Sequence, residues 1–580
     1  MRAFGQKTNF VCLVFAALLC TSLFPGSVFA DDKNDSNPPA KAAPIKMDAP
    51  APGLTERERW LLDRVEQLEK RVADLESRGN PSAAAEASAS QPASPNPATS
   101  SALENATSSV IGATTGEVAS NAIPKSAELA SVSAQATEKG KSGAAKASKA
   151  QPFAFADFTW LNGNARTKDT PYATQFFTPE IRADVDYNYD FNHPKDDTIG
   201  GSSEVFRSNE VHVTQLGVGG DFHYDNVRAR LMTQFGLYSQ TTARNDASPA
   251  RGQWNLDNAY RYVSEAYGGY HFNALHGINV DAGIFMSYIG LFSYYQFDNW
   301  AYQPSYVSSN TPWFFNGVRV QIFPTEHLKI EPWFVNGWQS YGRFNNRPGF
   351  GMQILWRPNG WLSVLGNQYA LGEDAFGAPG RVRYHTDDSI EIKYYDKPEN
   401  FLSKAAFSLT ADMGCEHGGG VSCSTNHGQG ANFHPKQSFL GYMFYNRFWF
   451  HKDLFGLTLG GGKINNPGRY LVLLPPINGA TAASGTPYFT ENPGDQFKAW
   501  DASGTFDYMP SQYITFRWEF DHRAANVPYF SGPGGITPTN CTTAALVENI
   551  CGTPGAFVQG FTPDLKKIEN RIGLSILVKF

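Results

Sequence analysis

Two cysteines and two histidines lie close enough in the sequence to share one loop: Cys415, His417, Cys423 and His427. Cysteine and histidine side chains are the usual ligands of zinc, so this group could bind one Zn²⁺ ion. The alternative is a disulfide between Cys415 and Cys423 beside solvated histidines, which an oxidising compartment favours. Cys541 and Cys551 form a second close pair without a nearby histidine, and their spacing predicts a second disulfide.

Catalytic motifs are missing from the sequence. Residues 460–463 (Gly-Gly-Gly-Lys) resemble part of a phosphate-binding loop, but Ile464 stands where that loop needs serine or threonine, and the preceding glycine spacing is wrong. The G-x-S-x-G nucleophile elbow of serine hydrolases does not occur. We therefore expect a protein that is not an enzyme and needs no cofactor.

Charged residues instead alternate with apolar residues. Between residues 180 and 191, polar and charged side chains occupy the even positions and apolar side chains the odd positions. A period of two is typical of a β-strand that presents one polar and one apolar face. The polar faces of the clearest strands supply candidate pore-lining residues: Glu180, Arg182, Asp184, Asp186, Arg228, Arg230, Arg517, Glu519 and Asp521. The alternative is that these charges pair between strands as salt bridges within the wall.

The elements that position these residues are strand-like runs of about ten residues, separated by turn-forming residues. About 16 such runs follow one another, as expected for a closed barrel. They begin near Glu180, Val211, Val227, Tyr262, Ile278, Thr311, Leu328, Gly349, Trp361, Ser389, Phe401, Ser438, Leu454, Phe497, Tyr513 and Asn570.

The connections between the predicted strands alternate in length. Short ones, such as 224–226 and 358–360, alternate with long ones, such as 193–209 and 290–310. Outer-membrane barrels have short turns in the periplasm and long loops outside, whereas a soluble all-β protein has no reason to sort its connections. The sequence therefore predicts an all-β fold, a transmembrane antiparallel β-barrel of about 16 strands.

The register of one strand follows from this prediction. In the run from 515 to 523, Arg517 and Glu519 are expected to face water inside the barrel, while Phe516, Trp518 and Phe520 face lipid. Charges on the lipid face would cost about 2–4 kcal/mol each near the bilayer midplane. We therefore expect the charged face of each strand to point inward.

Composition and charge exclude other classes of protein. The chain has 580 residues, a net charge of −6 and 41% hydrophobic residues. Its one long apolar run, from residue 10 to 24, leads to a small-residue cleavage pattern ending at Ala30, which predicts an exported chain with a cleaved signal peptide, 1–30. No other run is long enough to cross a membrane as a helix. The net charge provides no basic surface for nucleic acid.

The segment between the signal peptide and the barrel has three predicted parts. Residues 31–53 are polar and rich in proline and alanine, which predicts disorder. Residues 54–78 carry leucine at every seventh position, with valines between, which predicts a coiled coil; the alternatives are a helix packed on the barrel or a single long helix. Residues 79–151 are rich in Ala, Ser, Thr and Pro and predict a disordered linker before the barrel, 152–580.

Several stretches resemble a known family. The terminal RIGLSILVKF resembles the C-terminal signal of Gram-negative outer-membrane proteins. The stretches FADFTWLNGNARTKDTPYATQFFTPEIRADVDYNYDFNHP, EAYGGYHFNALHGINVDAGIFMSYIG and NTPWFFNGVRVQIFPTEHLKIEPWFVNGW resemble the OmpL-like beta-barrel porin family over residues 153–580. The resemblance implies a porin-like role in the outer membrane and supplies no specificity site. The coiled extension is similar in plan to those of some sugar-specific porins.

We therefore expect a porin in the Gram-negative outer membrane, assembled as a homotrimer, through which small hydrophilic solutes and ions diffuse passively. Its partners would be outer-membrane lipid, these solutes, copies of itself, and a periplasmic or cell-wall component that contacts the coiled coil. One alternative is a sugar-specific porin, in which aromatic side chains line the path; Trp500, Phe506 and Tyr508 share one strand face, whose direction stays open. A second is a surface adhesin or scaffold barrel that binds a partner through its loops, and an outer-membrane hydrolase comes third.

Overall fold

The structure, a computed structural model, describes residues 151–580 except 203, 244–245, 247–253, 344–345, 373–379, 427, 429–435, 467–496 and 536–563. The predicted signal peptide, the segment 31–53, the predicted coiled coil and all but the last residue of the predicted linker lie outside the described residues. His427, Cys541 and Cys551 lie outside them as well.

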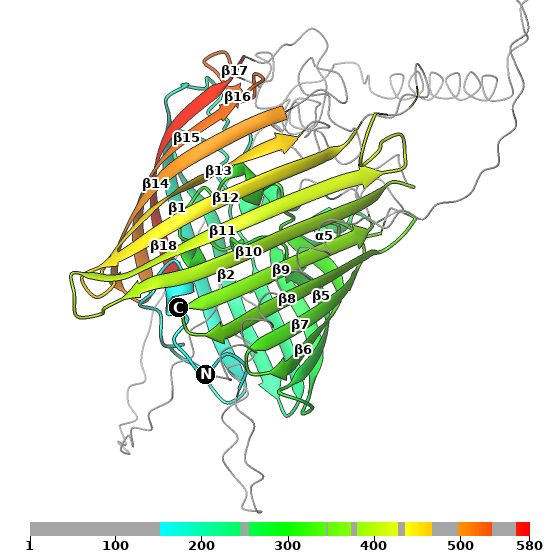
Figure 1. Ribbon diagram of the computed structural model, residues 1–580, viewed down its shortest axis with the longest axis vertical. Helices are drawn as coiled ribbons and strands as arrows, with labels where there is room; N and C mark the ends of the chain where they lie inside the picture. The colour runs from blue at the N-terminus through cyan, green and yellow to red at the C-terminus, as the bar shows by residue number, and fades with distance from the viewer. Residues whose placement is uncertain are drawn as a thin grey trace, which may run out of the picture. The chain divides into compact units, whose positions relative to one another are not determined.

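The described residues form one closed antiparallel barrel of sixteen strands (Figure 1). The strands are β1 (Phe177–Asp190), β2 (Val211–Tyr224), β3 (Val227–Thr233), β4 (Val263–Phe272), β5 (Ile278–Met286), β6 (Phe314–Thr325), β7 (Leu328–Val335), β8 (Gly349–Asn359), β9 (Leu362–Leu371), β10 (Val382–Asp396), β11 (Leu402–His417), β12 (Ser438–Phe450), β13 (Phe455–Asn466), β14 (Phe497–Ser511), β15 (Ile514–Ala525) and β18 (Ile568–Lys579). The predicted fold class is confirmed.

Each strand pairs with its neighbours in sequence, and β1 closes the ring against β18, with Val185 opposite Ile576. Closure leaves no free sheet edge, as a hydrocarbon environment requires. Strand β10 begins at Val382, earlier than the predicted start near Ser389, because the polar residues before Ser389 stay in the ladder with β9 and β11. A two-stranded sheet of β16 (Phe530–Ser531) and β17 (Leu565–Lys566) was not predicted.

The helices lie in the connections and before β1. They are short: η3 (Thr159–Leu161), α4 (Tyr238–Thr241), α5 (Leu256–Tyr260), η6 (Gln296–Asp298) and α6 (Tyr306–Ser309). In the part of the chain that the structure describes, no helix is long and apolar enough to span a membrane. Two of them, η6 and α6, belong to the long connection between β5 and β6, residues 287–313, and η3 belongs to the segment that precedes β1.

The two faces of the barrel wall differ as the period of two predicts. On β15, Trp518 and Phe520 point outward with 43% and 47% of their surface exposed, whereas Arg517 and Glu519 point inward with 1% and 4% exposed. On β18, Ile572, Leu574 and Ile576 are exposed on the outer face. The outer surface is therefore apolar where the strands run, and the charges lie inside.

We expect a charge on this outer face to be costly. Trp518→Arg should lower the free energy of unfolding in lipid by about 2–4 kcal/mol, because the guanidinium would enter hydrocarbon. Trp518→Leu, which keeps the site apolar, is the matched control. Urea unfolding of both variants in liposomes measures the difference, and equal stability would contradict the outward orientation of this face.

Candidate functional site

Two segments of the chain enter the interior of the barrel. The first is the connection between β5 and β6, residues 287–313, which we call the inner loop; every residue from 295 to 310 is buried. The second precedes β1 and comprises residues 153–167, which we call the N-terminal segment. The sequence predicts the connection at 290–310 as one of the long loops at the outer end of the barrel, and the structure shows that residues 295–310 of this loop are buried inside the barrel.

Strand β15 anchors the middle of the inner loop. The carboxylate of Glu519 accepts hydrogen bonds from the backbone N–H groups of Tyr302 and Gln303, each at 2.6 Å. The guanidinium of Arg517 donates to the backbone carbonyl oxygens of Asn299, at 2.6 Å, and Gln296, at 3.2 Å. Both charged side chains therefore bind the backbone of the loop instead of facing water.

Neighbouring strands anchor the same loop through its side chains. Asp298 forms ion pairs with Arg182 on β1, at 2.9 Å, and with Lys579 on β18, at 3.1 Å. The hydroxyl group of Tyr302 donates a hydrogen bond to Asp184 at 3.0 Å. The loop is thus bonded to the wall around the point where the barrel closes.

The inner loop also reaches the opposite side of the barrel from its origin. Ser305 Oγ donates to Asp501 on β14 at 2.7 Å, and the backbone N–H of Tyr306 donates to the same carboxylate at 3.0 Å. In the ring of described strands, β14 lies eight positions from β6 in either direction. The loop therefore crosses the lumen and narrows it.

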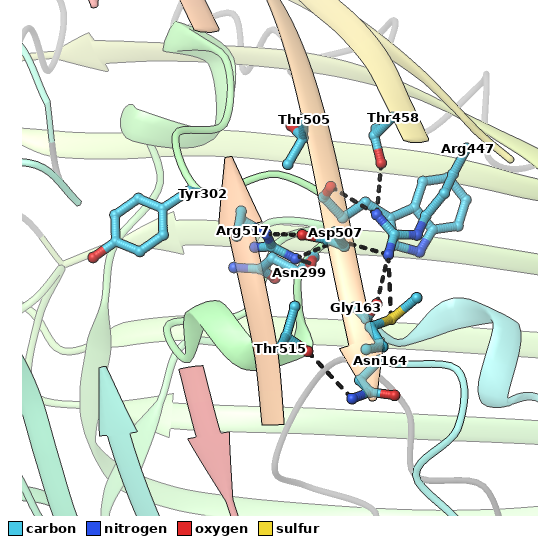
Figure 2. Close-up of polar contacts among 12 residues, drawn as sticks. Gly163, Asn164, Asn299, Tyr302, Arg447, Thr458, Thr505, Asp507, Thr515 and Arg517 are labelled. Atoms are coloured by element: carbon cyan, nitrogen blue, oxygen red, sulfur yellow. Dashed lines mark hydrogen bonds and ion pairs between the residues drawn. The ribbon is translucent and has the colours of Figure 1, made fainter. Parts of the chain in front are cut away.

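A cluster of three charged residues joins both interior segments to the wall; we call Arg447, Asp507 and Arg517 the junction cluster (Figure 2). Asp507 bridges the two arginines, accepting from Arg447 and from Arg517 at 2.7 Å each, and all three side chains have no exposed surface. Arg447 also donates to Trp300 O of the inner loop, at 3.2 Å, and to Gly163 O of the N-terminal segment, at 2.7 Å. One guanidinium thus holds the wall and both segments together.

An apolar cluster surrounds these contacts. It contains Trp160 and Leu161 from the N-terminal segment, Trp300 from the inner loop, and Tyr445 and Trp449 from β12, all of them buried. Trp300 and Trp449 pack edge to face with their ring centroids 5.6 Å apart. Burial of such large side chains is a main source of stability, so the interior of the barrel at this level is a packed core.

The predicted pore-lining residues all lie on the inner face, and each of them is buried. Arg230 pairs with Glu180, Asp221 and Glu265 at 2.8, 2.8 and 3.0 Å, and Arg228 lies 3.3 Å from Asp281. Asp186 accepts a hydrogen bond from Thr214, and Asp521 lies 4.0 Å from Arg571.

The prediction that Arg517 and Glu519 face water is therefore wrong. The charged side chains of the wall are paired with one another or with the inner loop. Side chains from neighbouring strands and from the inner loop occupy the positions that water was expected to fill.

Sequence reasoning missed Asp298, Arg447 and Asp507. Asp507 lies between Phe506 and Tyr508, and this alternation puts its charge on the inner face, whereas Arg447 shares the inner face with Tyr445 and Trp449. The period of two was therefore a usable signal for Asp507 but not for Arg447. Asp298 lies in a loop without a period, so no local pattern marks it. The question of the aromatic face on β14 is also settled, because Trp500 and Phe506 are exposed on the outside.

A disulfide joins Cys415, near the end of β11, to Cys423 in the loop that follows. Both sulfur atoms are therefore engaged, and the zinc site considered for this loop loses its two thiolate ligands. Among the described residues, no group of three or more histidine, cysteine or acidic side chains could hold a metal ion. Pairing of Cys541 with Cys551 stays a prediction.

We expect loss of the disulfide to leave the barrel folded. It closes a loop with a sequence separation of 8 residues, so Cys415→Ser with Cys423→Ser should lower the free energy of unfolding by at most about 2–3 kcal/mol. Mass spectrometry of non-reduced peptides checks the pairing, and urea unfolding checks the stability. Collapse of the barrel in the double variant, or a bridge from Cys415 to the 541–551 loop, would contradict this.

A pocket remains between the inner loop and strands β8 to β10. Its lining combines aromatic rings with hydrogen-bonding and charged groups, among them Tyr288, Phe292, Gln353, Arg357, Ser363 and Glu391. Arg357 is 3% exposed and lies over the ring of Phe158 of the N-terminal segment, with its Cζ atom 4.8 Å from the ring centroid. The pocket therefore adjoins both interior segments.

A closed antiparallel barrel with an apolar outer face, a charged inner wall and an inward-folded loop defines a porin-type barrel of the Gram-negative outer membrane. The chain belongs to the family described as "Putative beta-barrel porin-2, OmpL-like", whose model matches residues 182–549. The family resemblance inferred from the sequence is confirmed. No curated protein matches the sequence.

Solved porin structures resemble the chain at low identity. The outer-membrane channel DcaP of Acinetobacter baumannii is 13% identical, with 70% of this chain and 97% of that chain covered and a TM-score of 0.39. OprB of Pseudomonas putida is 11% identical, with 70% and 94% covered and a TM-score of 0.38. An anion-selective porin from Comamonas acidovorans is 8% identical, with 70% and 99% covered and a TM-score of 0.37.

Proposed function

We propose that the protein is a porin that lets small hydrophilic solutes and ions cross the outer membrane by passive diffusion. The observation that carries the proposal is the inner loop, which crosses a lumen walled by charged side chains. A narrow, charged passage selects permeants by size and by charge, and needs neither energy nor a cofactor. The pocket beside the inner loop, with Arg357 and Glu391 in its lining, is the proposed route.

We also propose that the chain is exported with cleavage after Ala30 and assembles as a homotrimer. The support is the signal-peptide pattern at 1–30 and the leucine heptads at 54–78. In this arrangement three barrels lie side by side and the coiled coil extends into the periplasm, where it contacts a periplasmic or cell-wall component.

The test is to reconstitute the purified full-length protein into planar lipid bilayers. Stepwise ohmic currents in potassium chloride support the porin. A heat-dependent change in gel mobility shows that the barrel in a preparation is folded. Absence of current steps in such a preparation would overturn the porin and favour the surface adhesin or scaffold. Reversal potentials in a salt gradient then give the ion preference.

A sugar-specific porin is the second candidate. The observation that favours it is the aromatic lining of the pocket, since Tyr288 and Phe292 lie beside the hydrogen-bonding groups of Gln353 and Ser363. Sugar rings bind to aromatic faces while their hydroxyl groups pair with such polar groups. Oligosaccharide added to conducting channels should interrupt the current at micromolar to millimolar concentration if this candidate is right, and should have no effect on a general porin.

A further inference from the structure

The N-terminal segment spans the barrel at the end where the short turns lie. At one end of the segment, the backbone N–H of Phe153 donates to Glu326 O in the turn between β6 and β7, at 2.8 Å. At its other end, Arg166 donates to Met509 O at 2.7 Å, beside the turn between β14 and β15. These two turns are eight strands apart in the ring of described strands, so they lie on opposite sides of the barrel mouth.

Between these ends, residues 158–165 of the segment are buried. Trp160 and Leu161 have no exposed surface, and the indole N–H of Trp160 donates to Gly360 O in the turn between β8 and β9, at 3.0 Å. Asn164 Nδ2 donates to Ser511 O, at 3.0 Å, on the far rim. The segment therefore bridges the mouth across its full width and contacts the rim at several turns.

The same segment packs directly on the inner loop. The N–H of Gly163 donates to Asp298 O at 2.9 Å. A Cβ atom at Gly163 would lie 2.4 Å from the carbonyl oxygens of both Phe297 and Asn299, which is too close for any residue except glycine. The segment is thus in direct contact with the inner loop, and together they span the barrel interior from the short-turn end to the level of that loop.

The strand ladder of the barrel wall closes without this segment. Strand β1 begins at Phe177, and its pairing with β18 closes the ring without a strand from residues 153–167, in the ladder that the structure describes. Withdrawal of the segment would therefore leave the backbone hydrogen bonds of the wall intact. It would break contacts such as those of Trp160 and Arg166 with carbonyl oxygens on the rim.

We propose that residues 153–167 are a releasable plug, which closes the periplasmic mouth of the barrel when seated and opens it when withdrawn. This inference rests on the proposed pore. The short turns mark the periplasmic end, and the chain enters the plug from its N-terminal side.

Two variants test the plug in opposite directions. A side chain added at Gly360 would place its Cβ 2.9 Å from the Cβ of Ala156, and a disulfide needs about 3.5–4.5 Å, so Ala156→Cys with Gly360→Cys should lock the plug after a small shift. Gly163→Ala should unseat it, because the added methyl group collides with two carbonyl oxygens. Gly268→Ala is the matched control, since nothing lies within 4 Å of a Cβ there.

In planar bilayers, Gly163→Ala should raise the mean single-channel conductance at least about twofold, since the narrowest section limits ion flow. The oxidised double-cysteine variant should stay in the lowest conductance level of the wild type, and reductant should restore the larger openings. Wild type treated with the same reductant controls for the native disulfide. Equal conductance of the wild type, Gly163→Ala and the locked variant would overturn the plug.

A second readout does not depend on current. The disulfide between residues 156 and 360 changes the mobility of the denatured chain on non-reducing gels, so its yield in membranes reports how often the plug is seated. A high yield of this disulfide that falls severalfold when Gly163→Ala is added supports the plug. If the yield behaves in this way but no variant conducts, only the proposed pore is overturned. Failure to cross-link in membranes would overturn the plug itself.

Discussion

Replacing Asp507 by alanine should destabilise the barrel by about 3–5 kcal/mol, because two buried arginines would lose their shared counter-charge. Asp507 bonds Arg447 and Arg517 at 2.7 Å each, and all three side chains are fully buried. Burial of an uncompensated charge costs far more than an ion pair gains. The loss should extend to both interior segments, since Arg447 and Arg517 also hold their backbone carbonyl groups.

Urea unfolding in liposomes, followed by tryptophan fluorescence, measures this effect. Lys566→Ala is the control, since it removes an ion pair with Asp564 whose side chains are 46% and 32% exposed, and exposed pairs contribute only about 0–1 kcal/mol. If Asp507→Ala lowers the free energy of unfolding by less than about 1 kcal/mol, water or another acidic group must compensate the charges of the two arginines. That result would contradict the burial of the junction cluster.

The second large effect is expected at Glu519. Its carboxylate accepts two backbone N–H groups of the inner loop, from Tyr302 and Gln303, and the hydroxyl of Thr505 at 2.6 Å. In Glu519→Gln one carboxylate oxygen becomes an NH₂ group. This group is a hydrogen-bond donor and would face a backbone N–H group of the inner loop, which is also a donor. The inner loop should detach from residue 519, and the conductance of the fully open level should rise at least about twofold as the constriction at the loop widens.

Asp396→Asn provides the matched control. It removes the same charge from an exposed position, where Asp396 pairs with Lys393 at the end of β10 with 41% of its side chain exposed. Both variants change the net charge equally, so a difference in conductance reports on the inner loop. If the two variants conduct alike, Glu519 does not hold the constriction.

The barrel could be predicted because its pattern is local. A period of two places Trp518 outside and Glu519 inside whatever else the chain does, and turn residues mark where a strand ends. The start of β10 was placed too late because Thr386, Asp387 and Asp388 resemble a turn in composition. In the structure, Asp387 and Asp388 pair in register with residues of both β9 and β11.

The contents of the lumen were harder to predict. The alternation identifies the inner face, but it does not reveal whether water or protein covers that face. The wealth of aromatic residues in the inner loop, such as Tyr295 and Trp300, was a sign of burial, since an exposed loop gains nothing from them. The inner-loop partners of Glu519 lie more than two hundred residues away, at a sequence separation of 217 from Tyr302, and no single-sequence pattern encodes such a pairing.

The bonds of Arg447 also constrain the order in which the molecule can be assembled. Trp300 and Gly163 are made early in synthesis, but their shared partner follows 147 and 284 residues later. Contacts of such high sequence separation form slowly, because a long chain must first be closed into a loop. The early segments therefore lack the contacts with Arg447 until β12 is made, and the final closure of β1 against β18 encloses them. A chain cut before β12 would retain both segments but lack all three residues of the junction cluster, which makes such fragments targets for periplasmic chaperones and proteases.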